Sequence, residues 1–205
     1  MRIAVEGLRL EGPDRGPLAR GLDLSFGPER ALVVSGGSGS GKTRFLKALA
    51  GTVHPLAGRV VRESNLRVGL ALGRGGLLVN TTLVQNLMLP LRFQGMRKEE
   101  ALERAVAALA QLGLASVGDL RPHALSDRQR KLGSLARVLA FDPDLVLLDE
   151  PLEALDPRDL PKVRALLGAW SSDAAKALVV ATERPEDHED LGALRLDLEE
   201  EGEGP

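Results

Sequence analysis

Residues 36–43 read Gly36-Gly37-Ser38-Gly39-Ser40-Gly41-Lys42-Thr43 and follow an apolar run at residues 31–34. Their spacing fits GxxxxGK[ST], the phosphate-binding loop that joins a strand to a helix. The glycines let successive backbone N–H groups point at phosphate oxygens, and the following helix presents its positive dipole end to the same anion. Lys42 is expected to reach the β and γ phosphates, and Thr43 to ligate Mg²⁺. The motif therefore predicts a nucleoside triphosphate site.

A second apolar run, residues 145–148, ends at two acids, Asp149 and Glu150. Such a run is typical of a buried parallel strand, whose carboxyl end lies where ligands bind. Asp149 is expected to hold Mg²⁺ through water. Glu150 is expected to stand near the γ phosphate and polarise an attacking water. Together with the phosphate loop, these acids complete a site for triphosphate hydrolysis.

Composition limits the classes of protein to consider. With 205 residues, 43% of them hydrophobic, the chain can form one α/β domain with room for a smaller inserted subdomain. A formal net charge of −2 gives no general attraction to nucleic acid, and the absence of cysteine excludes disulfides and thiolate metal sites. No apolar stretch reaches the roughly 18 residues that span a bilayer, and no targeting pattern opens the chain. We expect a cytoplasmic protein that reaches a membrane only through a partner.

The remaining pattern predicts an antiparallel strand pair at residues 2–10 and 22–26, joined by a turn at 11–17. Strands are expected at 31–35, 58–62, 66–72, 145–148 and 177–181, and Gly51 is expected to end the helix after the phosphate loop. Asp156 and Pro157 predict the start of a crossover helix that ends at Trp170, a packing residue. The acidic tail 199–205 is expected to be solvated, and surface loops are expected for His54, His123 and His188.

A mostly helical region is predicted from about residue 83 to 124. Within it, residues 98–112 place apolar side chains on one helical face that we expect to be buried: Ala101, Leu102, Ala105, Val106, Ala108, Leu109 and Leu112. The chain is thus expected to have a P-loop α/β fold with a mainly parallel core sheet, antiparallel edge strands and an inserted helical subdomain.

Several further segments carry a resemblance to a known family. Residues 125–129, LSDRQ, occupy the place of an LSGGQ signature; residues 145–151 end in LLDEP, residues 153–156 read EALD, and residues 135–140 read LARVLA. With the phosphate loop at 36–43, these segments resemble the nucleotide-binding subunit of an ABC transporter over nearly the whole chain. The resemblance implies one ABC ATPase domain at 1–205, with a core subdomain at about 1–75 and 140–205 and a helical subdomain at about 76–139.

The resemblance also implies a function and partners. In this family two ATPase domains sandwich two ATP molecules, so that the phosphate loop of one meets the signature of the other. Ser126 represents the signature here, and it is expected to be retained as a hydrogen-bond donor and as a helix cap. ATP and Mg²⁺ are the implied cofactors. A second ATPase subunit, identical or different, and transmembrane permease subunits are the implied partners, which would hold the chain on the inner face of the cell membrane. No nucleic acid partner is expected.

Four positions depart from the family pattern. Asp127 and Arg128 replace the signature glycines; a carboxylate there should repel a triphosphate, which Arg128 would partly offset. Counting back from Asn86, which matches the asparagine of a TVxEN segment, places Gly73 where a glutamine belongs. Glu183 replaces the switch histidine, and an ionised glutamate cannot donate a hydrogen bond. The chain has no tyrosine, and residues 10–17 offer no aromatic side chain to stack on adenine.

These departures leave two functional hypotheses. The first is the energy-coupling ATPase subunit of an ABC transporter, with Glu150 as the catalytic residue and a low turnover. The alternative is an ATP-binding regulatory or assembly subunit with little or no hydrolysis. Residues 76–93 include the segment NLMLPLR, which is similar to segments of bacterial lipid-trafficking and lipoprotein-release ABC subunits. The whole stretch is interpreted either as a docking surface for the permease or as ordinary packing within the helical subdomain.

Overall fold

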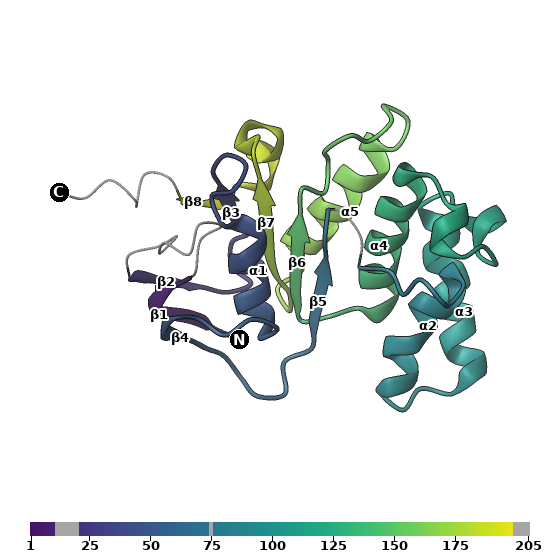
Figure 1. Ribbon diagram of the computed structural model, residues 1–205, viewed down its shortest axis with the longest axis horizontal. Helices are drawn as coiled ribbons and strands as arrows, with labels where there is room; N and C mark the ends of the chain where they lie inside the picture. Colours follow the sequence, from purple (N-terminus) through teal and green to yellow (C-terminus); the bar gives the residue numbers. More distant parts are fainter. Residues whose placement is uncertain (11–20, 74–75, 199–205) are drawn as a thin grey trace. The chain divides into compact units, whose positions relative to one another are not determined.

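The computed structural model describes residues 1–10, 21–73 and 76–198 (Figure 1). Contacts divide the chain into two compact units. The first unit contains Met1–Leu70, Asp144–Glu150 and Leu166–Pro205, and the second contains Ala71–Pro143 and Pro151–Ala165. The expected turn at 11–17 and the acidic tail lie outside the described residues. None of the described helices is long and apolar enough to cross a membrane.

Two sheets are found in the described part of the chain. A three-stranded sheet has the order β2-β1-β4, and a five-stranded sheet has the order β5-β6-β7-β3-β8. The first sheet contains β1 (Ile3–Arg9), β2 (Leu22–Phe26) and β4 (Ala57–Val61), and β1 pairs antiparallel with both neighbours. The second contains β3 (Leu32–Ser35), β5 (Val68–Ala71), β6 (Leu145–Asp149), β7 (Ala177–Thr182) and β8 (Leu194–Asp197). This arrangement confirms the predicted fold class and adds β8, which the sequence pattern did not indicate.

The register of the parallel strands positions the candidate site. β3 pairs parallel with β7, so that Ser35 lies opposite Thr182, and β6 pairs parallel with β7, so that Asp149 lies opposite Ala181. The carboxyl ends of three strands therefore meet at one edge of the sheet, and the segments that follow them begin side by side.

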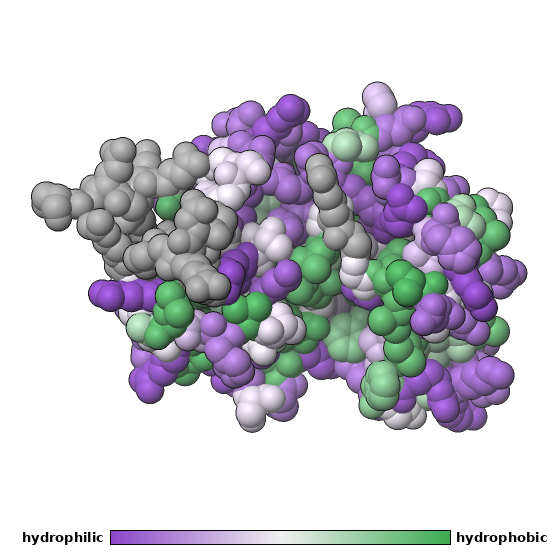
Figure 2. Space-filling view, viewed as in Figure 1, coloured by the Kyte–Doolittle hydropathy of each residue, from purple (hydrophilic) through white to green (hydrophobic). Residues whose placement is uncertain are grey.

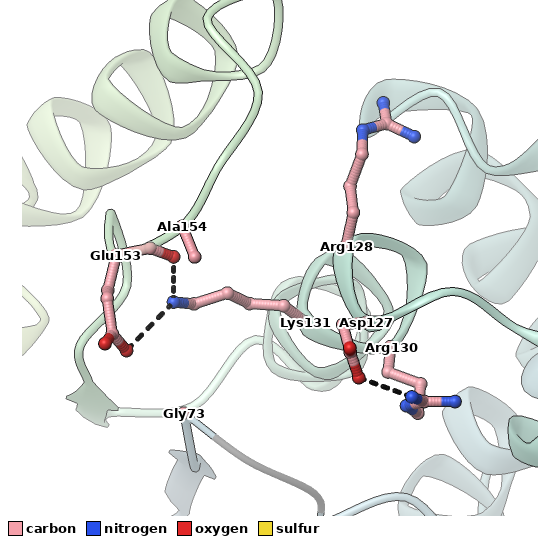
Figure 3. Close-up of a pocket in the computed structure, with 7 residues that line it drawn as sticks. All are labelled: Gly73, Asp127, Arg128, Arg130, Lys131, Glu153 and Ala154. Carbon is pink, nitrogen blue, oxygen red and sulfur yellow. Dashed lines mark hydrogen bonds and ion pairs between the residues drawn. The ribbon is translucent and has the colours of Figure 1, made fainter.

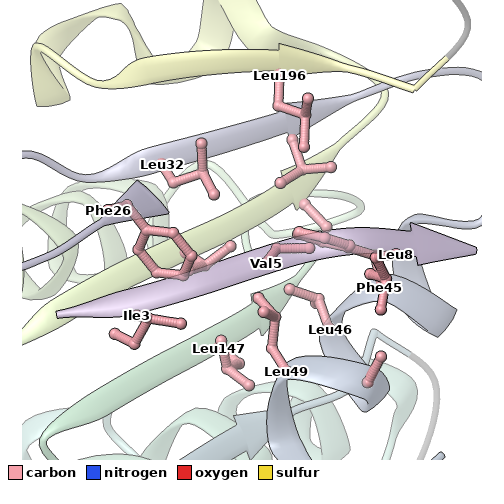
Figure 4. Close-up of a cluster of buried hydrophobic side chains, with 14 of the residues drawn as sticks. Ile3, Val5, Leu8, Phe26, Leu32, Phe45, Leu46, Leu49, Leu147 and Leu196 are labelled. Carbon is pink, nitrogen blue, oxygen red and sulfur yellow. The ribbon is translucent and has the colours of Figure 1, made fainter. Parts of the chain in front are cut away.

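One cluster of buried side chains joins the two sheets of the first unit to α1 (Lys42–Ala50) (Figure 4). α1 ends at Gly51 in the left-handed conformation, as predicted. Full burial of each large apolar side chain contributes about 1.5–3 kcal/mol, so the cluster holds α1 firmly against the sheets. Its members include Ile3, Val5, Leu8, Phe26, Leu32, Phe45, Leu46, Leu49, Leu147 and Leu196.

Two expectations for the segment after β6 need correction. α5 is Leu160–Ser172, so it begins three residues after Pro157. The Asp156 carboxylate accepts a hydrogen bond from Arg158 N (2.9 Å), which makes a local turn in place of the first helical turn. His188 is buried rather than on a surface loop, because the short helix η3 (Pro185–Leu191) packs against β3. Trp170 is buried, as expected.

In the second unit, α2 (Leu83–Phe93), α3 (Lys98–Gln111) and α4 (Asp127–Phe141) pack on one another. The short helices η1 (Ala115–Val117) and η2 (Pro122–Ala124) connect α3 to α4. The helix predicted at 98–112 is confirmed, but the burial of Leu102 and Val106 is not, since they are 42% and 49% exposed. The alanines of α3 make the close approach, and these two larger side chains line a surface pocket of about 140 Å³.

Apolar side chains of residues 76–93 divide between two faces. Leu83, Leu87 and Leu91 are fully buried, which accords with packing. By contrast, Val79 and Phe93 are 64% and 83% exposed. Figure 2 shows hydrophobic patches among hydrophilic side chains on the face that it displays. Packing therefore accounts for one face of α2, and the exposed side chains remain available to a partner.

Candidate functional site

The phosphate loop has the backbone that its glycines allow. Gly39 and Gly41 have φ values of 88° and 98°, a conformation that other residues rarely adopt. Ser40 N donates to Gly37 O (3.2 Å), and Phe45 N donates to Gly41 O (2.8 Å), which begins α1. Among the residues that the structure describes, no side chain caps the N-terminus of α1. The N–H groups of its first turn are therefore oriented to bind an anion.

Lys42 is folded back over the loop. Its side chain is only 7% exposed, and Nζ donates to Gly36 O (2.6 Å) and Gly37 O (2.8 Å). Two carboxylate oxygens lie near the same ammonium: Glu150 Oε1 at 3.8 Å and Glu183 Oε1 at 3.7 Å. The buried cation is thus surrounded by oxygen atoms from three segments of the first unit.

Thr43 and Asp149 meet beside this lysine. Thr43 Oγ1 donates a hydrogen bond of 2.7 Å to Asp149 Oδ2, across 106 residues of sequence. The two residues that were predicted to act at Mg²⁺ therefore lie within reach of one ion. Hydroxyl and carboxylate oxygens are the protein ligands that Mg²⁺ prefers.

Glu150 is held in an unusual backbone conformation at the end of β6. Its φ of 49° lies in the left-handed region, and its N–H donates to Ala181 O (2.8 Å) of β7. Burial raises the pKa of Glu150 above its ordinary value, which makes the carboxylate a stronger base. Within the described part of the chain, Oε1 accepts no hydrogen bond. This oxygen is therefore buried without a hydrogen-bond donor among the described residues, 3.8 Å from Lys42 Nζ.

Glu183 follows β7 and brings a second carboxylate to the lysine. The turn that carries it is braced by a hydrogen bond of 3.0 Å from Arg184 N to Thr182 Oγ1. The Glu183 side chain is 52% exposed, and its Oε1 makes an ion pair with Lys42. The sequence predicted the loss of a hydrogen-bond donor here, but not this contact, because nothing in the local sequence pairs residues 42 and 183.

The segment in the place of the signature belongs to the second unit. Ser126 is the N-cap of α4: its Oγ accepts from Gln129 N (3.2 Å), and its own N–H donates to Gln129 Oε1 (2.8 Å). This reciprocal capping box confirms that Ser126 caps the helix. Its contact with a nucleotide across a dimer remains a prediction.

Arg128 does not neutralise Asp127. Its guanidinium binds both oxygens of Asp159, with Nη2 donating to Oδ1 at 2.7 Å, and Asp159 is only 1% exposed. This hydrogen bond raises the pKa of Arg128. The Asp127 side chain is 98% exposed and forms an ion pair with Arg130. The sequence does not indicate this role of Asp159, since a single aspartate after Asp156-Pro157-Arg158 carries no signal of burial.

Gly73, expected in the place of a glutamine, lies beside the same segment. It lines a pocket of about 400 Å³ in the second unit, together with Asp127, Arg128, Arg130, Lys131, Glu153 and Ala154 (Figure 3). Lys131 donates to the backbone carbonyl of Glu153 across this pocket, whereas Arg128 points away from Lys131. Among the charged residues that line the pocket, Lys131 contacts Glu153 and Arg130 contacts Asp127.

Comparison with known proteins identifies the family. The family model described as ABC transporter matches residues 19–153, which is more than half of the chain. The lipoprotein-releasing system ATP-binding protein LolD of Chromohalobacter salexigens is 32% identical over 91% of this chain and 86% of its own length. The chain belongs to the ABC transporter family. It is an ATP-binding, energy-coupling ATPase subunit of this family.

Other relatives of this ABC ATPase act in different systems. The taurine import ATP-binding protein TauB of Pseudomonas syringae pv. tomato is 32% identical over 87% of this chain and 71% of its own length. Among solved structures, the dimeric structure of the bacterial ABC transporter cassette MJ0796 has a TM-score of 0.84 at 23% identity, covering 96% of this chain and 94% of that one. A post-hydrolysis state of MJ0796 with ADP and Pi has a TM-score of 0.80 at 24% identity, covering 90% and 89%. These structures agree in fold with the present one.

Proposed function

We propose that this ABC ATPase binds ATP together with Mg²⁺ and hydrolyses it slowly, to drive transport across a membrane. The observation that supports the proposal best is the meeting of Lys42, Thr43, Asp149 and Glu150 at one edge of the parallel sheet. Thr43 Oγ1 and Asp149 Oδ2 are 2.7 Å apart, and Lys42 Nζ and Glu150 Oε1 are 3.8 Å apart. These residues supply phosphate binding, ion binding and a base in one place.

The proposed ion site would be completed by the nucleotide. Mg²⁺ is commonly held by one or two protein oxygens together with phosphate oxygens and water. Thr43 and Asp149 provide two such oxygens. Across residues 1–10, 21–73 and 76–198, no group of three or more His, Cys, Asp or Glu side chains is placed to hold a metal ion. We therefore propose that Mg²⁺ enters with the triphosphate and joins it to Thr43 of α1 and Asp149 of β6.

Slow turnover is proposed because two supporting groups are missing. Gly73 has no side chain to contact the ion or the attacking water, and Glu183 offers a carboxylate where a hydrogen-bond donor would stabilise the γ phosphate. Loss of one transition-state donor costs about 10²- to 10³-fold in rate, and two losses combine in a non-additive way. The base Glu150 is present, so the expected rate is low but not zero.

We further propose that the chain works at the cytoplasmic face of a membrane with a second ATPase subunit and permease subunits. The structural neighbours include dimeric cassettes. Asp127 is exposed and Arg128 is engaged by Asp159, so this signature segment is poorly suited to a partner's triphosphate. A different subunit with an unaltered signature is therefore favoured over a second copy. The exposed apolar side chains at 78–93 support docking of a permease.

Purification from native membranes and an ATPase assay test this function. We expect permease subunits to copurify with the chain. The Glu150→Gln variant should lose the slow phosphate release of the wild-type complex, because an amide cannot accept a proton from water at neutral pH. Glu29→Gln, which removes the same charge from an exposed turn, serves as the matched control and should keep the wild-type rate.

The same assay distinguishes the proposed ATPase function from the alternative, an ATP-binding regulatory or assembly subunit. The ion pair between Lys42 and Glu183 favours that alternative, because it places a protein carboxylate at the ammonium that should meet phosphate. An equal, near-zero rate in the wild type and in Glu150→Gln, with ATP binding retained, would establish the regulatory role. A rate typical of unaltered family members would contradict slow turnover.

A further inference from the structure

Lys42 Nζ has a protein counter-ion where a phosphate is expected. The ammonium lies 3.7 Å from Glu183 Oε1 and 3.8 Å from Glu150 Oε1. The lysine of such a loop reaches the β and γ phosphates of a bound triphosphate. A terminal phosphate that approaches Lys42 must therefore enter the space around two carboxylates.

The charges near Lys42 are unbalanced. The Lys42 ammonium lies within ion-pair distance of Glu150 and Glu183, and a third carboxylate, that of Asp149, accepts a hydrogen bond from the adjacent Thr43. Asp149 is the proposed partner of Mg²⁺ and Glu150 is the proposed base, so both have a role with a triphosphate bound. Glu183 has no such role, since its carboxylate accepts hydrogen bonds but cannot donate one to phosphate.

The backbone prevents Glu183 from lying far from Lys42. Ser35, which precedes the phosphate loop, is opposite Thr182 in the parallel register of β3 and β7. The hydrogen bond from Arg184 N to Thr182 Oγ1 braces the turn that carries residue 183. The carboxylate can turn toward solvent, because its side chain is 52% exposed, but only by giving up the ion pair.

We propose that Glu183 is a specificity-determining residue that disfavours the terminal phosphate and so biases the site toward ADP. With a diphosphate bound, Lys42 meets only the β phosphate and can remain the counter-ion of Glu183. With a triphosphate bound, the γ phosphate takes Lys42 and leaves the carboxylate beside a second anion, which is unfavourable by Coulomb repulsion. This inference rests on the proposed function of the loop in binding ATP.

The test compares two affinities in the purified protein. The dissociation constants of Mg·ADP and of a nonhydrolysable Mg·ATP analogue are measured by calorimetry for the wild type and for Glu183→Gln. We expect Glu183→Gln to lower the dissociation constant of the triphosphate analogue by about tenfold and that of ADP by less than about twofold. A change of this size is expected when one partly exposed contact between like charges is removed. Glu186→Gln, an exposed acid in η3, is the matched control and should leave the ratio of the two constants unchanged.

The ratio of the two dissociation constants is the decisive quantity. If Glu183 had only a structural role, its substitution would weaken the binding of both nucleotides to the same extent. Equal changes for both nucleotides, or a ratio that stays at the wild-type value, would overturn the inference while nucleotide binding stands. A wild-type protein that binds neither nucleotide would overturn the proposed function and this inference together.

Discussion

Thr43 and Asp149 illustrate how one contact between distant residues can make a site. Thr43 is the last residue of the phosphate motif and Asp149 is the last residue of β6, and a 2.7 Å hydrogen bond joins them. Each residue alone is a common surface polar group. Only their meeting, beside a loop built to bind phosphate, gives two oxygens that can share one ion.

At this scale we predict that Thr43→Val reduces the effect of Mg²⁺ on nucleotide binding. The gain in ADP affinity on adding Mg²⁺ should fall by about tenfold, or ~1.4 kcal/mol, because a methyl group cannot ligate the ion. Titrations of ADP with and without Mg²⁺ measure this gain. Thr52→Val is the control at the other end of α1, where Thr52 Oγ1 donates to Lys47 O, and it should keep the full gain. An undiminished gain in Thr43→Val would contradict the proposed ion site.

Gly133 in α4 and Gly168 in α5 differ in how close the side chains of other residues lie to them. A Cβ at Gly133 in α4 would lie 2.7 Å from Leu83 Cδ1 and 3.5 Å from Leu77 Cδ1. Leu83 is completely buried, so it has little room to move. A Cβ at Gly168 in α5 would meet no atom within 4 Å. Gly133 thus lets α2 pack directly on α4, whereas Gly168 makes no comparable contact.

We predict opposite effects of alanine at these two positions. Gly133→Ala should lower the free energy of unfolding by about 1–2 kcal/mol, because the added methyl group overpacks the contact with Leu83. Gly168→Ala should raise it by about 0.5–1 kcal/mol, because alanine favours the helix without a clash. Urea unfolding of the two variants and the wild type measures both changes. An increase at both positions would show that helix propensity, rather than packing, governs both sites, and a decrease at both would contradict the prediction for Gly168.

At the scale of the whole molecule, the five-stranded sheet gathers segments that are far apart in the chain. The start of β5 is tied to the start of β6 by Arg67 and Asp144: Arg67 Nη2 donates to Asp144 Oδ1 (2.7 Å), and Arg67 N donates to Asp144 Oδ2 (2.9 Å). Asp144 N in turn donates to Arg67 O (2.9 Å). The hydrogen bonds of Arg67 hold the pKa of Asp144 below its ordinary value.

This pair predicts a dependence of stability on pH. Because the folded pKa of Asp144 is depressed, its contribution is fully present above the unfolded pKa of about 4 and is lost as the pH falls through the folded pKa. Asp144→Asn should therefore cost about 1 kcal/mol of unfolding free energy at pH 7, a modest value for a partly exposed pair. The difference from the wild type should shrink as the pH falls below about 4.

Urea unfolding at several pH values measures this difference. Asp119→Asn removes an exposed carboxylate and serves as the control. We expect its difference in unfolding free energy from the wild type to be small and independent of pH. A difference between Asp144→Asn and the wild type that stayed constant from neutral pH into acid would contradict the linkage.

The sequence was sufficient to predict features whose geometry depends only on residues close together in the chain. The phosphate loop, the capping residue Ser126 and the apolar strand that ends at Asp149 each depend on neighbours within a few residues, so all three were predicted with the fold class. Predictions that required a distant partner were less successful. The burial of Leu102 and Val106 was wrong because amphipathic spacing marks an apolar face but not how closely another helix approaches it.

The amino-acid sequence by itself determined that this protein has a phosphate loop and a strand that ends in two acids, because strand, turn and helix preferences act over short distances. Only the tertiary structure decided which charges meet. The parallel register of β3, β6 and β7 brings Thr43 to Asp149 and places Glu150 and Glu183 at Lys42, and packing within the second unit binds Arg128 to the buried Asp159. Ion pairs depend on distances in space, and residues as far apart as 42 and 183 come together only when the sheet forms.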